Sequence, residues 1–218
     1  MRIAHLDVQE LITRFLALKG AHLQDLWVLS MSGHRVGFFV EFGAYDGMAS
    51  SNTFILEKKY GWKGIIAEPA VGMKSQIIAN RDCKLDFRAV WDKSNEIIKF
   101  NEDLTEGYLS VASEDSQITT NNFNLSYSVQ TVTLLDLLRD HNAPKIINYI
   151  SVDIEGSELR VITNFFENNT FYDVKLWTVE HNYRKDAGRL LELFAINGYQ
   201  VVHSQLSLRD YWFVKREN

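Results

Sequence analysis

Acidic side chains follow several apolar segments of this chain, at the points where buried strands are expected to end. Glu68, Asp153 and Glu180 each close such a segment, and His181 and Asn182 follow directly after Glu180. The carboxyl ends of parallel strands share one edge of a sheet, so these groups are expected to meet there. Uncompensated carboxylates in a cleft cost free energy, which favours binding or catalysis over packing as their role.

A short glycine-bounded turn, Gly43-Ala-Tyr-Asp-Gly47, follows the first of these apolar segments. Glycine permits a sharp turn and lets backbone N–H groups approach a ligand closely. Glu68 lies about 25 residues after Gly43, near the roughly 20-residue offset of a ribose-binding carboxylate in nucleotide folds. The turn lacks the G-x-G-x-x-G spacing of a pyrophosphate site, and its Asp46 could meet an ammonium group together with Glu41. This pattern favours S-adenosylmethionine over a dinucleotide, although Glu41 could equally be a buried acid that caps the turn.

Strands and helices alternate from residue 37 onward, which predicts an α/β fold with a mostly parallel sheet and helices on both faces. Strands are expected at 37–42, 65–68, 85–90, 129–132, 148–153, 175–180, 199–203 and 211–215, the last two antiparallel. Helices are expected at 51–60, 71–80, 134–140, 157–168 and 185–197. Lys93-Ser-Asn95 predicts a hairpin turn into a strand at 96–100.

The regions outside this alternation are the N-terminus and one polar segment. Residues 1–35 predict an N-terminal helical cover, with helices at 7–19 and 22–31, and residues 36–218 predict one globular domain. The polar segment 101–126 is consistent with either a surface loop or a substrate-binding lid.

Composition excludes several classes of function. The net charge of the 218 residues is −5 and no Lys/Arg-rich run occurs, so capture of nucleic acid or of an anionic membrane is not expected. Cys83 is the only cysteine, which excludes an internal disulfide and fits a reducing compartment. The first residues lack the apolar centre of a signal peptide, so a cytoplasmic location is expected.

Several ordered motifs, from about residue 36 to the end, closely resemble the FkbM family of S-adenosylmethionine-dependent methyltransferases. They are Glu41-Phe-Gly-Ala-Tyr-Asp-Gly47, Ser51-Asn-Thr53, Leu56-Glu57, Gly61-Trp-Lys-Gly64 with the following Ile-Ile-Ala-Glu-Pro69, and Ser151-Val-Asp-Ile-Glu-Gly-Ser-Glu158. The resemblance implies a class I (Rossmann-like) methyltransferase fold. Its seven strands would have the order 3-2-1-4-5-7-6, with strand seven antiparallel.

The resemblance also implies a cofactor site and a reaction. Gly43, Ala44 and Gly47 would line the methionine part, Glu68 would bind both ribose hydroxyls, Ala89 or Val90 would border adenine, and Asp153 would lie beside the reactive methyl. Members of the family methylate hydroxyl oxygens, often on sugars or polyketides. The implied enzyme is an O-methyltransferase that acts on a small-molecule or carbohydrate acceptor.

Two routes for removing the hydroxyl proton are open. His181 could act as a general base, because imidazole titrates near neutrality, or it could instead brace the strand end or bind a metal. Alternatively, Asp153, Glu180 and Asn182 offer the hard oxygen ligands preferred by magnesium or calcium, and such an ion would acidify the acceptor hydroxyl.

Two other classes of function compete with the methyltransferase. One is a non-catalytic protein that keeps the S-adenosylmethionine fold as a binding or interaction module, which the intact glycine turn and Glu68 disfavour. The other is a nicotinamide dehydrogenase, which the missing G-x-G-x-x-G motif disfavours.

Overall fold

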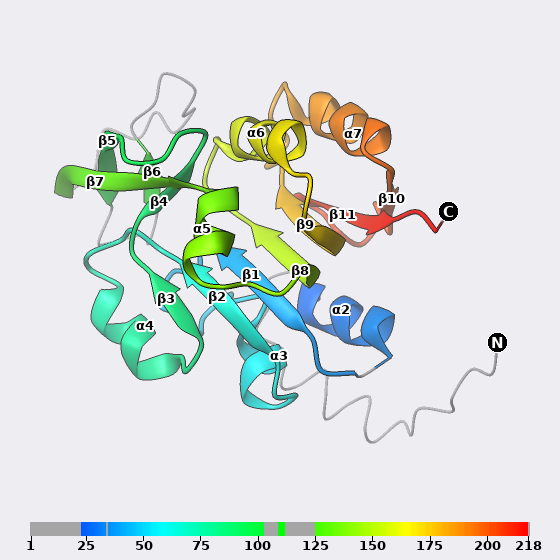
Figure 1. The fold of residues 1–218 in the computed structure, drawn as a ribbon, viewed down its shortest axis with the longest axis horizontal. Coiled ribbons are helices and arrows are strands. Elements are labelled where there is room, and N and C mark those ends of the chain that lie inside the picture. The colour runs from blue at the N-terminus through cyan, green and yellow to red at the C-terminus, as the bar shows by residue number, and fades with distance from the viewer. Residues whose placement is uncertain (1–22, 34, 103–108, 112–124, 218) are drawn as a thin grey trace.

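Two β-sheets organise the computed structural model, which describes residues 23–33, 35–102, 109–111 and 125–217 (Figure 1). The larger sheet contains β1 (Phe38–Phe42), β2 (Lys63–Ala67), β3 (Lys84–Asp86), β8 (Ile146–Val152), β9 (Asp173–Glu180), β10 (Tyr199–Val202) and β11 (Asp210–Lys215). The smaller contains β4 (Ala89–Trp91), β5 (Ile97–Glu102), β6 (Leu109–Val111) and β7 (Leu125–Thr133). The helices are α2 (Gln24–Ser32), α3 (Phe54–Lys58), α4 (Lys74–Asn80), α5 (Leu134–Asp140), α6 (Glu158–Asn168) and α7 (Ala187–Ile196).

The topology of the larger sheet is the one expected of a class I methyltransferase. Its strands lie in the order β10-β11-β9-β8-β1-β2-β3, with parallel pairing from β9 through β3. β11 is antiparallel to both β9 and β10. Numbered among themselves along the chain, the seven strands read 3-2-1-4-5-7-6 with strand seven antiparallel, which confirms the predicted fold class.

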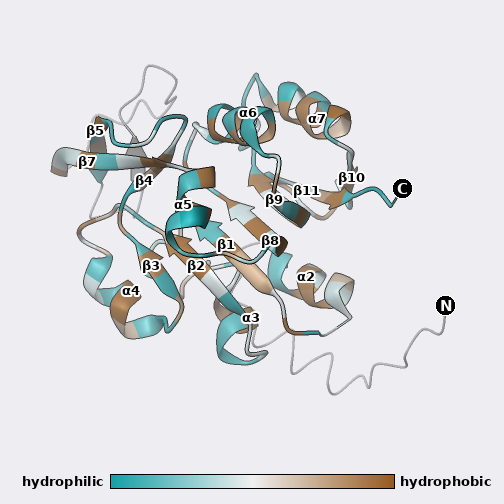
Figure 2. Cartoon of the chain, in the orientation of Figure 1, coloured by the Kyte–Doolittle hydropathy of each residue, from teal (hydrophilic) through white to brown (hydrophobic). Residues whose placement is uncertain are grey.

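Helices cover both faces of the larger sheet because apolar side chains of its central strands alternate between the faces. Val40 and Phe42 of β1 pack with buried residues of α5, α6 and α7. Phe39, between them, packs on the other face with residues of α2 and α3. Figure 2 shows the hydrophobic residues concentrated in these strands and on the helix sides that face them.

The smaller sheet corrects the expectation of one strand at 85–90. The chain instead ends β3 at Asp86 and begins β4 at Ala89, in a different sheet. Asp86 Oδ1 accepts a hydrogen bond from the Arg88 backbone N–H at 2.9 Å, and the Arg88 side chain also binds this carboxylate. This local carboxylate–backbone bond competes with strand pairing and bends the chain.

The predicted hairpin at Lys93-Ser-Asn95 is also wrong. β4 and β5 are not paired with each other, because β7 lies between them. The Asn95 N–H donates to the Thr131 carbonyl at 2.9 Å, and the Thr131 N–H donates to the Glu96 carbonyl at 2.9 Å. The turn at residues 93–95 is therefore held by β7, which comes much later in the chain.

The N-terminal cover is described in part. α2 matches the helix expected at 22–31, and its Trp27 stacks on Trp212 of β11 with ring centroids 5.0 Å apart. The helix expected at 7–19 and most of the polar segment 101–126 lie outside the described residues. Among the described helices, none combines the length and the apolar character that crossing a bilayer requires.

Candidate active site

The glycine turn follows β1 in the chain and contacts the end of β8. Gly43 has φ +79°, and a Cβ at this position would lie 1.6 Å from the backbone oxygen of Asp153. The Asp153 N–H donates to the Phe42 carbonyl at 3.2 Å, so the two strand ends are in direct contact. Only glycine fits at position 43, and this close approach places Asp153 beside the turn.

Glu68 follows β2 and is 1% exposed. Its Oε2 accepts from the Tyr45 N–H at 3.2 Å and its Oε1 from the Ala70 N–H at 3.0 Å. Burial, with a smaller contribution from Glu102, raises the pKa of Glu68 to about 7. The Ala44 backbone also bonds this carboxylate, so three of its roughly four acceptor positions are used and one remains for a ligand hydroxyl.

A narrow cavity lies between Glu68 and the smaller sheet. Gly43, Glu68, Ala89, Val90, Phe100 and Asp153 contribute to its walls. Ala89 and Val90, which were expected to border adenine, line this cavity together with Glu68, although β4 rather than the third strand of the larger sheet carries them. The cavity holds about 30 Å³, roughly the share of one water molecule in the liquid. The buried Phe100 ring is the bulkiest of these side chains.

Glu41 of β1 is buried against the segment that leads into α3. It is 2% exposed, and its Oε1 accepts from the Asn52 N–H at 2.7 Å. Its Oε2 accepts from the hydroxyls of Ser51 and Thr53 at 2.9 and 2.5 Å. Glu41 is thus a buried acid, as expected for one of its two roles, but it bonds residues 51–53 and not the N–H groups of the glycine turn.

Arg81 is the centre of this buried network, and no sequence pattern predicted its role. Its Nη1 donates to the Gly47 carbonyl at 3.0 Å and lies 3.5 Å from Glu41 Oε2. Its Nη2 donates to Thr53 Oγ1 at 2.8 Å, and its Nε donates to Glu57 Oε2 at 2.5 Å. One guanidinium therefore ties the glycine turn, the start of α3 and the end of α4 together.

The other predicted residues of the turn form its internal structure. Asp46 Oδ1 accepts from the backbone N–H groups of Met48 and Ala49 at 2.8 and 2.6 Å. The Gly47 N–H donates to the Ala44 carbonyl at 2.8 Å, and the Ala44 side chain is buried in the core. Their structural effect is to hold the turn beside Glu68.

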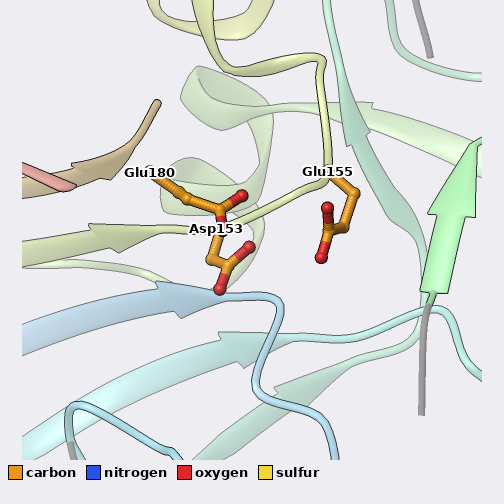
Figure 3. A group of neighbouring side chains, drawn as sticks. All are labelled: Asp153, Glu155 and Glu180. Atoms are coloured by element: carbon orange, nitrogen blue, oxygen red, sulfur yellow. The ribbon is translucent and has the colours of Figure 1, made fainter. Parts of the chain in front are cut away.

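A cluster of carboxylates lies at the ends of β8 and β9. Oxygens of Asp153, Glu155 and Glu180 lie within 4.8 Å of one another. Figure 3 shows Glu180 next to Asp153, with Glu155 approaching from the loop after β8. Arg184 Nη2 lies 3.2 Å from Glu180 and 3.8 Å from Glu155, and Arg184 also pairs with Glu158. One arginine thus pairs with three acids, while Asp153 lies beside them.

Burial and the crowding of these acids raise the pKa values of Asp153, Glu155 and Glu180, so these carboxyl groups stay protonated to higher pH. Burial and the neighbouring Glu180 and Glu155 raise the pKa of Asp153 well above its usual range. Burial, followed by Glu155 and Glu158, raises the pKa of Glu180 to about 8. Glu180 and Asp153 share a hydrogen bond, so this pair holds a proton near neutral pH.

Asp153 also borders a second, more polar cavity of about 210 Å³. Asn52, Thr178, Glu180, Arg209 and Asp210 contribute to its walls. Asp153 therefore borders both the narrow Glu68 cavity and a polar cavity large enough for a small molecular unit.

His181 borders neither of these two cavities. Its ring packs on Tyr211 with centroids 4.1 Å apart, its Nδ1 accepts from the Tyr183 N–H at 3.1 Å, and the ring also bonds the Leu208 backbone. Burial and Arg184 lower its pKa. These contacts match the bracing role that was the alternative for His181. Asn182, the third predicted metal ligand, is exposed, and Glu155 lies with Asp153 and Glu180 in the carboxylate cluster.

The comparisons with known proteins identify the family. The model of the methyltransferase FkbM domain matches residues 41–201, which is most of the chain. The chain belongs to the FkbM methyltransferase family. It is therefore an S-adenosylmethionine-dependent methyltransferase, as its motifs predicted. No relative of the FkbM chain was found among curated proteins.

Solved methyltransferase structures resemble the FkbM chain at low identity. A proposed RNA methyltransferase from Pyrococcus horikoshii is 13% identical, with a TM-score of 0.47 over 91% of this chain and 83% of that one. Magnesium protoporphyrin IX methyltransferase from Synechocystis, solved with bound S-adenosylmethionine, is 8% identical, with a TM-score of 0.48 over 88% and 76%. Precorrin-6y C5,15-methyltransferase from Geobacter metallireducens is 10% identical, with a TM-score of 0.45 over 87% and 85%. Similarity at this level carries no information on the acceptor.

Proposed function

We propose that this FkbM methyltransferase transfers a methyl group to a hydroxyl oxygen of a small sugar-like or natural-product acceptor. The observation that carries the proposal is the position of Asp153, which borders both the Glu68 cavity and the polar cavity. A methyl donor on one side of Asp153 and an acceptor on the other would be held in the alignment that the transfer needs.

The donor site is proposed to follow the glycine turn. S-adenosylmethionine supplies the methyl group when it is bound. Glu68 offers an acceptor position for a ribose hydroxyl, Ala89 and Val90 offer an apolar wall, and the close approach of Gly43 holds Asp153 at the same cavity. Ala44, Asp46, Gly47 and Glu41 support this site by holding the turn in place.

Binding must open the narrow cavity, because a volume of about 30 Å³ does not admit an adenosine group. Phe100 of β5 and the loop after Glu68 close it. Glu102 Oε1 accepts from the Gly72 N–H at 3.1 Å, and the Val71 N–H donates to the Tyr127 hydroxyl at 2.8 Å. We expect Phe100 to turn aside, or these bonds to lengthen, when the donor binds.

The Asp153–Glu180 pair is proposed to accept the hydroxyl proton. Glu180 has a pKa of about 8, close to the pH at which the enzyme is expected to work, and both carboxyls border the polar cavity. His181 remains a second candidate for this base, but its ring contacts support positioning of the β9 end.

Affinity for S-adenosylhomocysteine is expected to rise about tenfold between pH 5.5 and 7. Glu68 has a pKa of about 7 in the free protein, and a ribose hydroxyl donates to its ionised form, so binding releases the proton that Glu68 carries at lower pH. The rise should flatten above pH 7. Isothermal titration at several pH values measures it.

Glu68→Gln is the matched variant for this titration, since it keeps the shape of the side chain but cannot ionise. Its affinity should be weaker at pH 7 and nearly constant over the same range. A wild-type affinity that does not change between pH 5.5 and 7 would remove Glu68 from the ribose site.

A divalent cation that lowers the pKa of the acceptor hydroxyl is the alternative to a general base. Carboxylate oxygens of Asp153, Glu155 and Glu180 fit magnesium or calcium as ligands, whereas Arg184 already supplies positive charge to two of them. We therefore expect methyl transfer to survive exhaustive chelation with less than a twofold loss. Loss of transfer that returns on adding magnesium or calcium would instead assign the cluster to a metal.

A small acceptor is also what the charge of the chain supports. The net charge of −5 and the acidic cluster disfavour nucleic acid as the acceptor, although RNA methyltransferases occur among the structural neighbours. A cytoplasmic location is proposed on the single cysteine, Cys83. Desolvation raises the pKa of its half-buried thiol to about 12, which makes it a poor nucleophile.

A further inference from the structure

One face of the smaller sheet closes the Glu68 cavity. Phe100 of β5 and Tyr127 of β7 are paired directly across the two strands, and their ring centroids are 5.7 Å apart. Glu102 lies two residues after Phe100, so its side chain is on the same face of the strand. Phe100 borders the cavity, whereas Glu102 and Tyr127 bind the loop that follows Glu68. Phe100, Glu102 and Tyr127 are called the closing face below.

The closing face holds two consecutive backbone N–H groups of this loop. The Val71 N–H donates to the Tyr127 hydroxyl at 2.8 Å, and the Gly72 N–H donates to Glu102 Oε1 at 3.1 Å. The Tyr127 hydroxyl in turn donates to Glu102 Oε2 at 2.8 Å, which ties the two acceptor groups to each other. Movement of the closing face away from the loop therefore breaks both backbone bonds together.

The closed arrangement also carries an electrostatic cost. Glu102 is 0% exposed, and within the described part of the chain its carboxylate is held by hydrogen bonds and by no cation. It lies near Glu68, the second buried carboxyl of this region, and contributes to the raised pKa of that group. Burial of a carboxylate near another acid costs free energy, which exposure to water would recover. The two loop bonds and the packing of Phe100 hold the cavity closed against this cost.

We propose that the closing face keeps the Glu68 cavity shut in the free protein and moves away from the loop as one unit when the donor binds. The inference rests on the proposed function for the identity of the ligand, but not for the opening of the loop bonds. It favours movement of the whole face over rotation of Phe100 alone, because the Phe100 ring lies against Tyr127. The donor then binds only the open fraction of the protein, so the Tyr127 hydroxyl limits the rate and the affinity of binding.

Tyr127→Phe tests the closing face, because it keeps the ring beside Phe100 and removes the hydroxyl that binds Val71 and Glu102. The closed state loses these bonds, so the open fraction rises. Association of S-adenosylhomocysteine, followed by stopped-flow tryptophan fluorescence, should become about tenfold faster at an unchanged dissociation rate. The affinity should therefore rise about tenfold. A hydroxyl that only supported the bound site would have the opposite effect, since its loss would speed dissociation.

Amide hydrogen exchange measures the opening without relying on a binding rate. In the free protein, the amides of Val71 and Gly72 should exchange about tenfold faster in Tyr127→Phe than in the wild type. In the wild type, saturating S-adenosylhomocysteine should also speed exchange of these two amides, because they lose their side-chain partners when the closing face moves away. A ligand that bound without this movement would slow their exchange or leave it unchanged.

Tyr172→Phe is the matched control. Tyr172 directly precedes β9, at the end of this strand away from Glu180. Loss of its hydroxyl should change neither the binding rates nor the exchange of Val71 and Gly72. If Tyr127→Phe does not fold, exchange in the wild type with and without S-adenosylhomocysteine decides the question.

The closing face and the proposed function fail separately. Folded wild-type protein that does not bind S-adenosylhomocysteine at millimolar concentrations would contradict the proposed donor site, and faster exchange in Tyr127→Phe would still support the closing face. Unchanged association and exchange in folded Tyr127→Phe would overturn it and assign the opening to the Phe100 side chain alone. Weaker binding by this variant, or slower exchange of Val71 and Gly72 in the liganded wild type, would overturn it as well.

Discussion

Arg81→Met is expected to lower the free energy of unfolding by about 3–5 kcal/mol. The substitution keeps an unbranched side chain but removes the guanidinium that serves Glu41, Glu57 and the Gly47 carbonyl. The side chain of Arg81 is completely buried and those of Glu41 and Glu57 nearly so, which leaves two buried carboxylates without their cation. Urea denaturation followed by circular dichroism measures the loss.

Arg139→Met is the matched control for this substitution. Arg139 pairs with Asp136 on the surface of α5, with side chains 64% and 40% exposed. A pair of this kind contributes little, so the expected change is below about 0.5 kcal/mol. Equal effects of the two substitutions would contradict the central role of the Arg81 network.

Gly43→Ala is expected to destabilise the fold by about 3–5 kcal/mol and to abolish binding of S-adenosylhomocysteine. A methyl group at this position would lie 1.6 Å from the backbone oxygen of Asp153. Because that neighbour is backbone, the ends of β1 and β8 would have to separate. Thermal denaturation and isothermal titration on the same preparation record both effects.

Gly61→Ala separates this clash from the cost of the backbone conformation alone. Gly61 has φ +71°, close to that of Gly43, but open space surrounds the position of its Cβ. The expected loss is about 1–2 kcal/mol, with cofactor affinity unchanged. The account of the glycine turn would be wrong if Gly43→Ala behaved like Gly61→Ala.

Elements that depend on local patterns could be predicted from the sequence. The helix expected at 134–140 is α5, and Thr133 caps it by accepting from the Asp136 N–H at 3.1 Å. The order of the seven strands followed from the resemblance to the FkbM family. The smaller sheet could not be predicted, because its pairing depends on β7, which comes from a distant part of the chain and separates β4 from β5.

The candidate site likewise contains residues that could be predicted from the sequence and residues that could not. The apolar segments that end in Glu68, Asp153 and Glu180 predict that these acids share one edge of the sheet, and they follow or end the parallel strands β2, β8 and β9 at that edge. The Arg81 network was not predictable, because a single arginine after α4 carries no motif and acts through residues far away in sequence.

The central claim is that the donor binds between the Gly43 turn and Glu68, with its reactive end at Asp153. A crystal structure with S-adenosylhomocysteine tests this most directly. We expect the ribose on the Glu68 carboxylate, the adenine against Val90 with Phe100 displaced, and the homocysteine running past Gly43 to Asp153. No ligand density in this cavity at millimolar concentrations, or a ligand bound elsewhere on the chain, would contradict it.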